Sequence, residues 1–238
     1  MKTIGLIGGL SWESSAEYYR IVNEAVKARL GGTHSARCLL WSFDFAEIEA
    51  LQHAGEWDAA TDRMVAAARA VERGGADVIA ICSNTMHRMA DAVAAAVSVP
   101  LLHIADPTGE AIVAAEVRTV GLLGTRFTME EAFYRGRLAS RFGLDVLIPD
   151  EADRATVHDI IYRELIVGDF REESRERYRG VMARLAARGA GAIILGCTEI
   201  GLLVGAADST VPLFDTTRLH AEATVTFALS DEQVATAM

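Results

Sequence analysis

The chain has 238 residues and a formal net charge of −10, from 33 acidic and 23 basic side chains. This acidic balance, with no basic cluster, argues against nucleic acid or an anionic membrane surface as a partner. No apolar run approaches the ~20 residues of a membrane span, and the strand pattern starts at once with no signal peptide before it. We therefore expect a cytoplasmic protein with one large or two small domains.

Short apolar runs alternate with segments of helical spacing through the first half of the chain. The expected strands are 3–8, 36–43, 76–82 and 100–104, and the expected helices are 12–30, 58–73, 86–97 and 107–116. Ser11 is the expected N-cap of the first helix. The segment 44–57 is expected to be irregular or weakly helical.

The second half of the chain follows the same order of elements. The expected strands are 119–124, 144–148 and 192–197, and the expected helices are 128–142, 153–167 and 171–188. Such alternation predicts an α/β fold with mostly parallel sheets that helices cover on both faces.

Three segments of the first half recur, in register, half a chain length later. The matched pairs are 73–82 with 188–197, 3–8 with 119–124, and 99–102 with 211–214. The first pair superposes Cys82 on Cys197. The repeat predicts two similar α/β units, each presenting one cysteine at the end of an equivalent strand.

Polar residues follow each cysteine: Ser83, Asn84 and Thr85 in the first unit, and Thr198 and Glu199 in the second. The side chains of Asn84, Thr85 and Thr198 suit a carboxylate. Ligands bind at the carboxyl ends of parallel strands, and the helix N-terminus that follows would lower the pKa of a thiol and offer N–H donors to an anion. We therefore predict a cleft that holds an anionic substrate between two thiols.

A single cysteine at the end of a strand is more often a small buried hydrophobe than a catalytic group. Cys38, within the second strand, is expected to be only that. Two matched cysteines favour catalysis, because inversion at Cα needs one group to remove a proton and a counterpart to supply one to the opposite face. Glu199 either orients or deprotonates Cys197, or is merely an acid favoured in the first turn of a helix.

A glycine turn follows the first strand. Its spacing is not that of a dinucleotide fingerprint, so we expect Gly9, Leu10 and Ser11 to present backbone N–H groups to a small anion. We expect no bound metal, because neither His87 nor any other histidine or cysteine has a partner at metal-ligand spacing.

Lysine and cysteine counts narrow the chemistry further. The only lysines are Lys2 and Lys27, and neither ends a core strand, so a pyridoxal-phosphate Schiff base is not expected and no cofactor is predicted. The three cysteines do not suggest a disulfide framework.

Three stretches resemble the aspartate/glutamate racemase family, whose members need no cofactor and use a pair of cysteines. They are Ile81–His87 (ICSNTMH), Leu195–Ile200 (LGCTEI) and Gly5–Ser14 (GLIGGLSWES). Within the family, His103–Asp106 and Leu123–Arg126 are most similar to the bacterial broad-specificity amino-acid racemases.

The resemblance implies two pseudo-symmetric α/β domains with the active site in the cleft between them. The implied domains are 1–98 with 210–238, carrying Cys82, and 99–209, carrying Cys197. The two cysteines would face each other across Cα, and the chain would form a homodimer. Ser83, Asn84, Thr85 and Thr198 would bind the α-carboxylate or the amino group.

The expected substrate is a small amino acid of relaxed side-chain specificity. Acid-specific members carry basic residues where this chain offers Gln52 and Glu164, so uncharged side chains such as that of homoserine are favoured over aspartate or glutamate. Arg163 would oppose this expectation if it turned inward.

Other functions remain open at this point. Within the superfamily they are a hydantoin racemase, a maleate isomerase and an arylmalonate decarboxylase, the last of which needs only one cysteine. A non-catalytic protein that binds a small carboxylate is the alternative from another class, and proton exchange at Cα would exclude it.

Overall fold

The computed structural model describes residues 1–235, with side chains described through residue 230. The chain divides into two compact units. The first comprises Met1–His103 and the C-terminal segment from His220 onward, and the second comprises Ile104–Leu219. The division into domains 1–98 with 210–238 and 99–209 stays a prediction.

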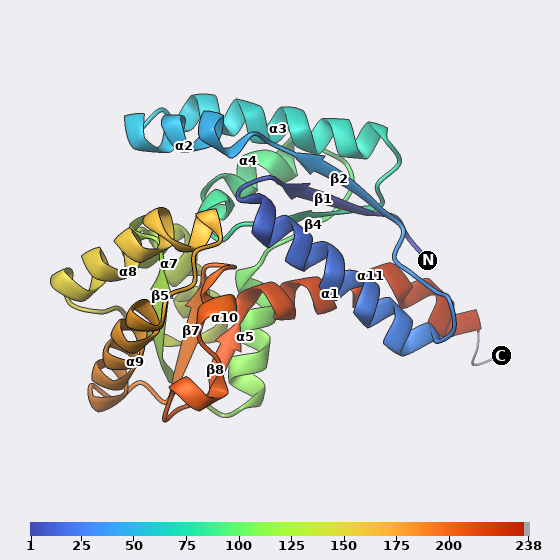
Figure 1. Cartoon of the computed structure of the whole chain (residues 1–238). Coiled ribbons are helices and arrows are strands. Elements are labelled where there is room, and N and C mark those ends of the chain that lie inside the picture. Colours follow the sequence, from blue (N-terminus) through green and yellow to red (C-terminus); the bar gives the residue numbers. More distant parts are fainter. Residues whose placement is uncertain (236–238) are drawn as a thin grey trace. The chain divides into compact units, whose positions relative to one another are not determined.

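The first unit is built on a parallel four-stranded sheet in the order β2-β1-β3-β4 (Figure 1). Its strands are β1 (Ile4–Gly8), β2 (Cys38–Ser42), β3 (Val78–Ile81) and β4 (Leu101–Leu102). Every residue of β1 and β3 is buried, as expected of central parallel strands covered on both faces.

Helices cover both faces of this sheet. They are α1 (Trp12–Leu30), α2 (Phe45–Ala54), α3 (Trp57–Arg73), η1 (Thr85–Met89), α4 (Ala90–Ala95) and α11 (Thr216–Ala235). Leu6 and Val78 share a core with Val22 of α1 and Val225 of α11. The other core joins α2, α3 and α4 to the opposite face, and Figure 1 shows α3 running over β1 and β2.

The second unit repeats this arrangement. Its parallel sheet has the order β6-β5-β7-β8, with β5 (Thr119–Gly124), β6 (Asp145–Leu147), β7 (Ala192–Gly196) and β8 (Leu213–Asp215). Its helices are α5 (Ala105–Ala114), α6 (Arg126–Glu130), α7 (Ala132–Phe142), α8 (Glu151–Arg163), η2 (Leu165–Val167), α9 (Glu172–Ala187), α10 (Ile200–Leu203) and η3 (Ala206–Asp208). One core contains the buried side chains of β5, β7, α8 and α9.

The two sheets confirm the predicted α/β class and the internal repeat. β1 and β5 occupy the same place in the two strand orders, as do β3 and β7. A cysteine directly follows each strand of the second pair. In the described part of the chain, no helix is long and apolar enough to cross a membrane.

Several predicted helices differ in extent from those observed. The helix predicted over 86–97 is a 3₁₀ helix followed by the short α4, and the helix over 128–142 is broken at Glu131, whose backbone is extended. The segment predicted as irregular or weakly helical contains the helix α2, which the Asp44 side chain caps by accepting a hydrogen bond from the Ala46 N–H.

Cys38 lies elsewhere in its strand than predicted. It is the first residue of β2, an edge strand, and it is half-buried, not enclosed by the sheet. The prediction placed Cys38 mid-strand because small and apolar residues precede it. The pairing of β2 with β1 begins at Cys38, which lies opposite Ile4.

Candidate active site

Cys82 follows β3 at the carboxyl end of the first sheet. Its backbone N–H donates to the Ile7 carbonyl at 2.8 Å, which continues the ladder between β1 and β3. The Ser14 hydroxyl of α1 donates to the Cys82 carbonyl at 3.3 Å. The side chain is fully buried, and the loss of solvation raises the pKa of the thiol.

That pKa direction is opposite to the one predicted from the helix N-terminus. The prediction assumed a regular helix after Cys82, whereas η1 is a short 3₁₀ helix and the Asn84 side chain at its N-cap forms no capping hydrogen bond. Desolvation therefore outweighs the helix dipole, and Cys82 is a protonated thiol near neutral pH.

The turn after Cys82 carries three of the predicted substrate-binding residues. The Ser83 hydroxyl accepts a hydrogen bond from the Met86 N–H at 3.4 Å, and Asn84 and Thr85 are buried at the same end of the sheet. Their side chains thus lie on the segment that also fixes Cys82.

The glycine turn after β1 differs in part from the prediction. Gly9 has φ of +70°, and a Cβ atom there would lie 2.2 Å from the Phe43 nitrogen, so only glycine fits. Its N–H donates to the Ser15 hydroxyl at 2.7 Å, so that donor is already used within the protein. Ser11 caps α1 as predicted, accepting a hydrogen bond from the Ser14 N–H.

Gln52 reaches the same turn from α2. It is only 4% exposed, and its side-chain nitrogen donates to the Met86 sulfur at 3.2 Å. In the first unit the structure therefore brings Gln52 toward the segment that follows Cys82.

Cys197 follows β7 at the carboxyl end of the second sheet, and it is half-buried. Its S–H donates to Oε2 of Glu199 at 3.0 Å, and the Thr198 hydroxyl donates to the same oxygen at 2.6 Å. Glu199 is 1% exposed. Burial, and then the neighbouring Glu199 charge, hold the pKa of the Cys197 thiol well above its usual range.

Glu164 closes α8 as its C-terminal cap residue. Its carboxylate accepts a hydrogen bond from the Ser174 hydroxyl at 2.5 Å and lies 3.7 Å from an Arg171 nitrogen. Arg163 instead has a 77% exposed side chain, 3.7 Å from Asp159 on the same helix. The rotation that would have turned Arg163 inward is therefore absent.

Tyr178 of α9 interacts electrostatically with Cys197 and Glu199, which no sequence pattern predicted. Its side chain is fully buried, and burial together with the charges of Cys197, Glu199 and Glu164 raises the pKa of its phenol well above the usual value. Glu164 thus shares these electrostatic surroundings with Cys197. Tyr178 fits the ordinary helical spacing of buried residues in α9, so the sequence carried no signal for this interaction.

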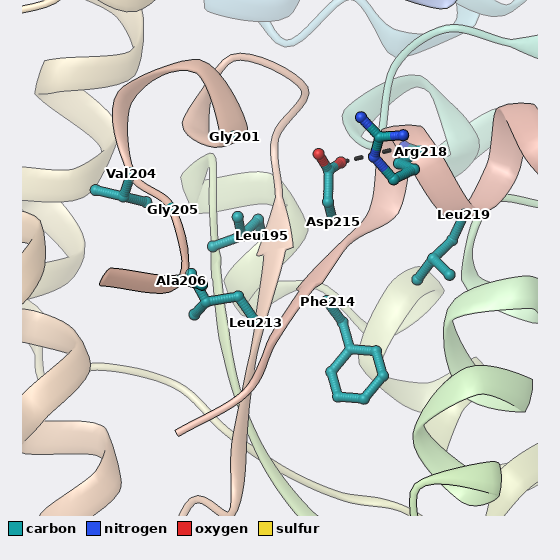
Figure 2. Close-up of a pocket in the computed structure, with 10 residues that line it drawn as sticks. All are labelled: Leu195, Gly201, Val204, Gly205, Ala206, Leu213, Phe214, Asp215, Arg218 and Leu219. Atoms are coloured by element: carbon teal, nitrogen blue, oxygen red, sulfur yellow. Dashed lines mark hydrogen bonds between the residues drawn. The ribbon is translucent and has the colours of Figure 1, made fainter. Parts of the chain in front are cut away.

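The pocket in Figure 2 lies apart from the predicted site residues, and the described residues contain no candidate metal site. Among the described residues, no group of three or more His, Cys, Asp or Glu side chains is placed to hold a metal ion. The pocket in Figure 2 lies beside β7 and β8, has a volume of about 350 Å³, and is lined by residues such as Leu195, Phe214 and Asp215. None of the predicted site residues lines it.

Comparison with known proteins defines the class. The family described as Asp/Glu/Hydantoin racemase matches residues 7–224. The chain is 27% identical over 163 residues to the broad specificity amino-acid racemase RacX of Bacillus subtilis (strain 168), which covers 67% of this chain and 68% of that protein.

Two crystal structures are similar over nearly the whole chain. One, from Yersinia pestis and provisionally described as an Asp/Glu racemase, is 52% identical with a TM-score of 0.89, covering 96% of this chain and 100% of that one. The other, an aspartate racemase homologue from Pyrococcus horikoshii OT3, is 33% identical with a TM-score of 0.82, covering 96% and 99%. This chain belongs to the Asp/Glu/hydantoin racemase family and is an isomerase.

Proposed function

We propose that this chain is a cofactor-independent amino-acid racemase that inverts Cα with Cys82 and Cys197. The observation that carries the proposal is the equivalent placement of the two cysteines. Each follows the third strand, in chain order, of a sheet with the same strand order. A duplicated thiol suits inversion, because the proton must leave one face of Cα and return to the other.

The hydrogen bond between Cys197 and Glu199 supports a route for the first proton. A thiol whose pKa is raised is a protonated acid at neutral pH, so a base must take its proton before the sulfur can remove the Cα proton. The Glu199 carboxylate accepts the Cys197 S–H. It therefore takes this proton, and the resulting thiolate removes the Cα proton.

Cys82 completes the inversion as the acid. Its S–H delivers a proton to the opposite face of the carbanion, which leaves a Cys82 thiolate and a protonated Glu199. Exchange with water returns the proton from Glu199 to Cys82. The reverse reaction uses the same groups with acid and base exchanged.

The substrate's α-carboxylate and amino group are assigned to the polar residues at the two strand ends. The proposed set is Leu10, Ser11, Ser83, Asn84, Thr85 and Thr198, and Gly9 shapes the turn that carries the first two. Hydroxyl, amide and backbone N–H donors suit a carboxylate, and side-chain oxygens suit an ammonium group.

Gln52 and Glu164 are assigned to the substrate side chain, with broad specificity that favours uncharged groups. Glu164 is a 15% exposed carboxylate that Ser174 and Arg171 already engage. A second carboxylate beside it would be poorly compensated, and an uncompensated buried charge costs several kcal/mol. Homoserine and methionine are therefore better candidates than aspartate.

The proposed working form is a cytoplasmic homodimer. The three cysteines are free thiols, which suits a reducing compartment. The resemblance to the racemase family supports the dimer. Light scattering during gel filtration measures the mass directly, and a monomer at working concentrations would contradict this part of the proposal.

Proton exchange at Cα is the decisive test of the function. Each enantiomer of the common amino acids is incubated with the protein in deuterium oxide, and the products are separated by chirality and weighed by mass spectrometry. We expect deuterium incorporation together with formation of the other enantiomer. Tight binding of an amino acid with neither exchange nor inversion would identify a binding protein instead.

A further inference from the structure

Three histidines from distant parts of the sequence pack together inside the first unit. They are His87 of η1, His103 after β4, and His220 of α11, with exposed fractions of 2%, 8% and 0%. The ring centroids of His87 and His103 are 4.6 Å apart, and those of His87 and His220 are 5.7 Å apart. We call this group the histidine cluster.

Their backbone partners define which ring nitrogens carry protons. A carbonyl oxygen can only accept, so His220 donates from Nε2 to the Leu102 carbonyl at 2.9 Å. In the neutral ring Nδ1 is then the acceptor, and the Tyr18 hydroxyl donates to it at 2.9 Å. By the same reasoning, His87 donates from Nδ1 to the Ser83 carbonyl at 2.7 Å. The neutral His220 ring thus has a defined tautomer and forms a hydrogen bond at each of its two nitrogens.

The hydrogen bond from His87 ends on the residue next to Cys82. The Cys82 carbonyl is held by the Ser14 hydroxyl of α1, and the following carbonyl, that of Ser83, is held by His87. Two consecutive peptide groups beside the thiol are therefore fixed from two different elements. The local 3₁₀ helix has a hydrogen bond from the Met86 N–H to the Ser83 hydroxyl, while its N-cap side chain forms no capping bond, so the bond from His87 is a second link to Ser83.

We propose that His87 is a positioning residue for Cys82, and that His103 and His220 hold its ring in place. The catalytic part of this inference rests on the proposed racemase function. Misplacing a reacting group by about 1 Å can cost a factor of about 10² in rate, so a hydrogen bond that aims the thiol acts on turnover more than on substrate binding.

Two substitutions at one position separate the hydrogen bond from the shape of the ring. His87→Phe keeps an aromatic ring in the histidine cluster and removes the hydrogen-bond donor to the Ser83 carbonyl. His87→Asn loses the ring, but its side-chain NH₂ group lies close to the place of Nδ1 and can donate to the same carbonyl. His34→Asn, in an exposed loop, is the control for loss of a histidine as such.

Two measurements report on Cys82. The first is kcat and KM for racemisation of the best substrate. The second is the rate at which iodoacetamide alkylates Cys82, relative to Cys197 in the same sample, read by peptide mass spectrometry. For His87→Phe we expect kcat to fall by about 10²-fold with KM little changed, and Cys82 to be alkylated faster relative to Cys197. His87→Asn and His34→Asn should keep the unmutated ratio and most of kcat.

The alkylation ratio decides the inference even if racemisation is not observed, because it needs no turnover. An unmutated protein without racemase activity would overturn the proposed function alone. Folded His87→Phe protein with an unchanged ratio would overturn the positioning role. If His87→Phe does not fold, as circular dichroism would reveal, His87→Asn decides, and an altered ratio in that folded variant would contradict the inference.

Discussion

At the residue scale, the proposed mechanism requires each of the two cysteines, because inversion needs an acid and a base at once. We expect Cys82→Ala and Cys197→Ala each to lower racemisation by at least the ~10²–10⁴-fold typical of a positioned acid or base. Chiral separation of the products measures this loss, and circular dichroism verifies the fold.

Cys38→Ala is the matched control for these variants. Cys38 begins the edge strand β2, and burial raises the pKa of its thiol. Its turnover should equal that of the unmutated protein. A dead Cys38→Ala beside an active Cys197→Ala would refute the argument from the repeat.

Glu199→Gln tests the proton acceptor of Cys197. The amide oxygen can still accept hydrogen bonds from the Cys197 S–H and the Thr198 hydroxyl, but it cannot take a proton at neutral pH. We expect kcat to fall by about 10²-fold or more. Because the Glu199 charge raises the pKa of Cys197, its removal lowers that pKa, so the remaining activity should rise as the pH is raised and the thiolate forms directly. A flat alkaline pH profile of kcat would argue against this role.

Gln52→Arg tests the side-chain pocket. Gln52 is buried and reaches the segment after Cys82, so an arginine there would offer a cation to an acidic side chain. We expect kcat/KM for aspartate or glutamate to rise relative to homoserine. Gln52→Met, similar in length but uncharged, is the control and should not favour the acidic substrates. A tenfold preference of the unmutated protein for aspartate or glutamate would show that another basic group completes the pocket.

At the scale of elements, α2 matters because it carries Gln52, and the cap at Asp44 holds its start. Asp44→Ala removes the acceptor for the Ala46 N–H and should lower the free energy of unfolding by about 1 kcal/mol. Urea denaturation followed by circular dichroism measures the change. Asp44→Asn keeps an acceptor oxygen and should retain most of the stability, so equal losses in both variants would exclude the cap as the cause.

The same helix shows what local sequence reasoning overlooks. The residues around Gln52 lack a strong apolar stripe, and only Ile48 and Gln52 of α2 are buried, so the periodicity that revealed α3 is absent here. After Cys82 the error is the opposite one. A continuous helical pattern predicted one α-helix, whereas the segment begins as the 3₁₀ helix η1, in which the His87 side chain bonds to the Ser83 carbonyl, and continues as α4.

At the scale of the whole molecule, the two equivalent sheets provide every group that the proposed reaction needs without a cofactor. We expect activity to persist after dialysis against a chelator and hydroxylamine, with no pyridoxal absorbance. The reason is that Lys2 and Lys27 are the only lysines, and Lys2 donates to Ser230 while Lys27 is exposed on α1. Loss of activity that pyridoxal phosphate restores would contradict this expectation.

The sequence by itself determined the α/β class, the repeat and the two cysteines at the strand ends. These depend on local patterns, namely apolar runs, helical spacing and the position of a residue relative to the end of its strand. The tertiary structure decided the raised pKa of the two thiols, the hydrogen-bond acceptor of the Cys197 thiol, the electrostatic surroundings of Tyr178, and the histidine cluster. The pKa of a buried thiol depends on every element packed around it, so no local pattern predicts it. His87 and His220 are distant in the chain, so no local pattern predicts their contact either.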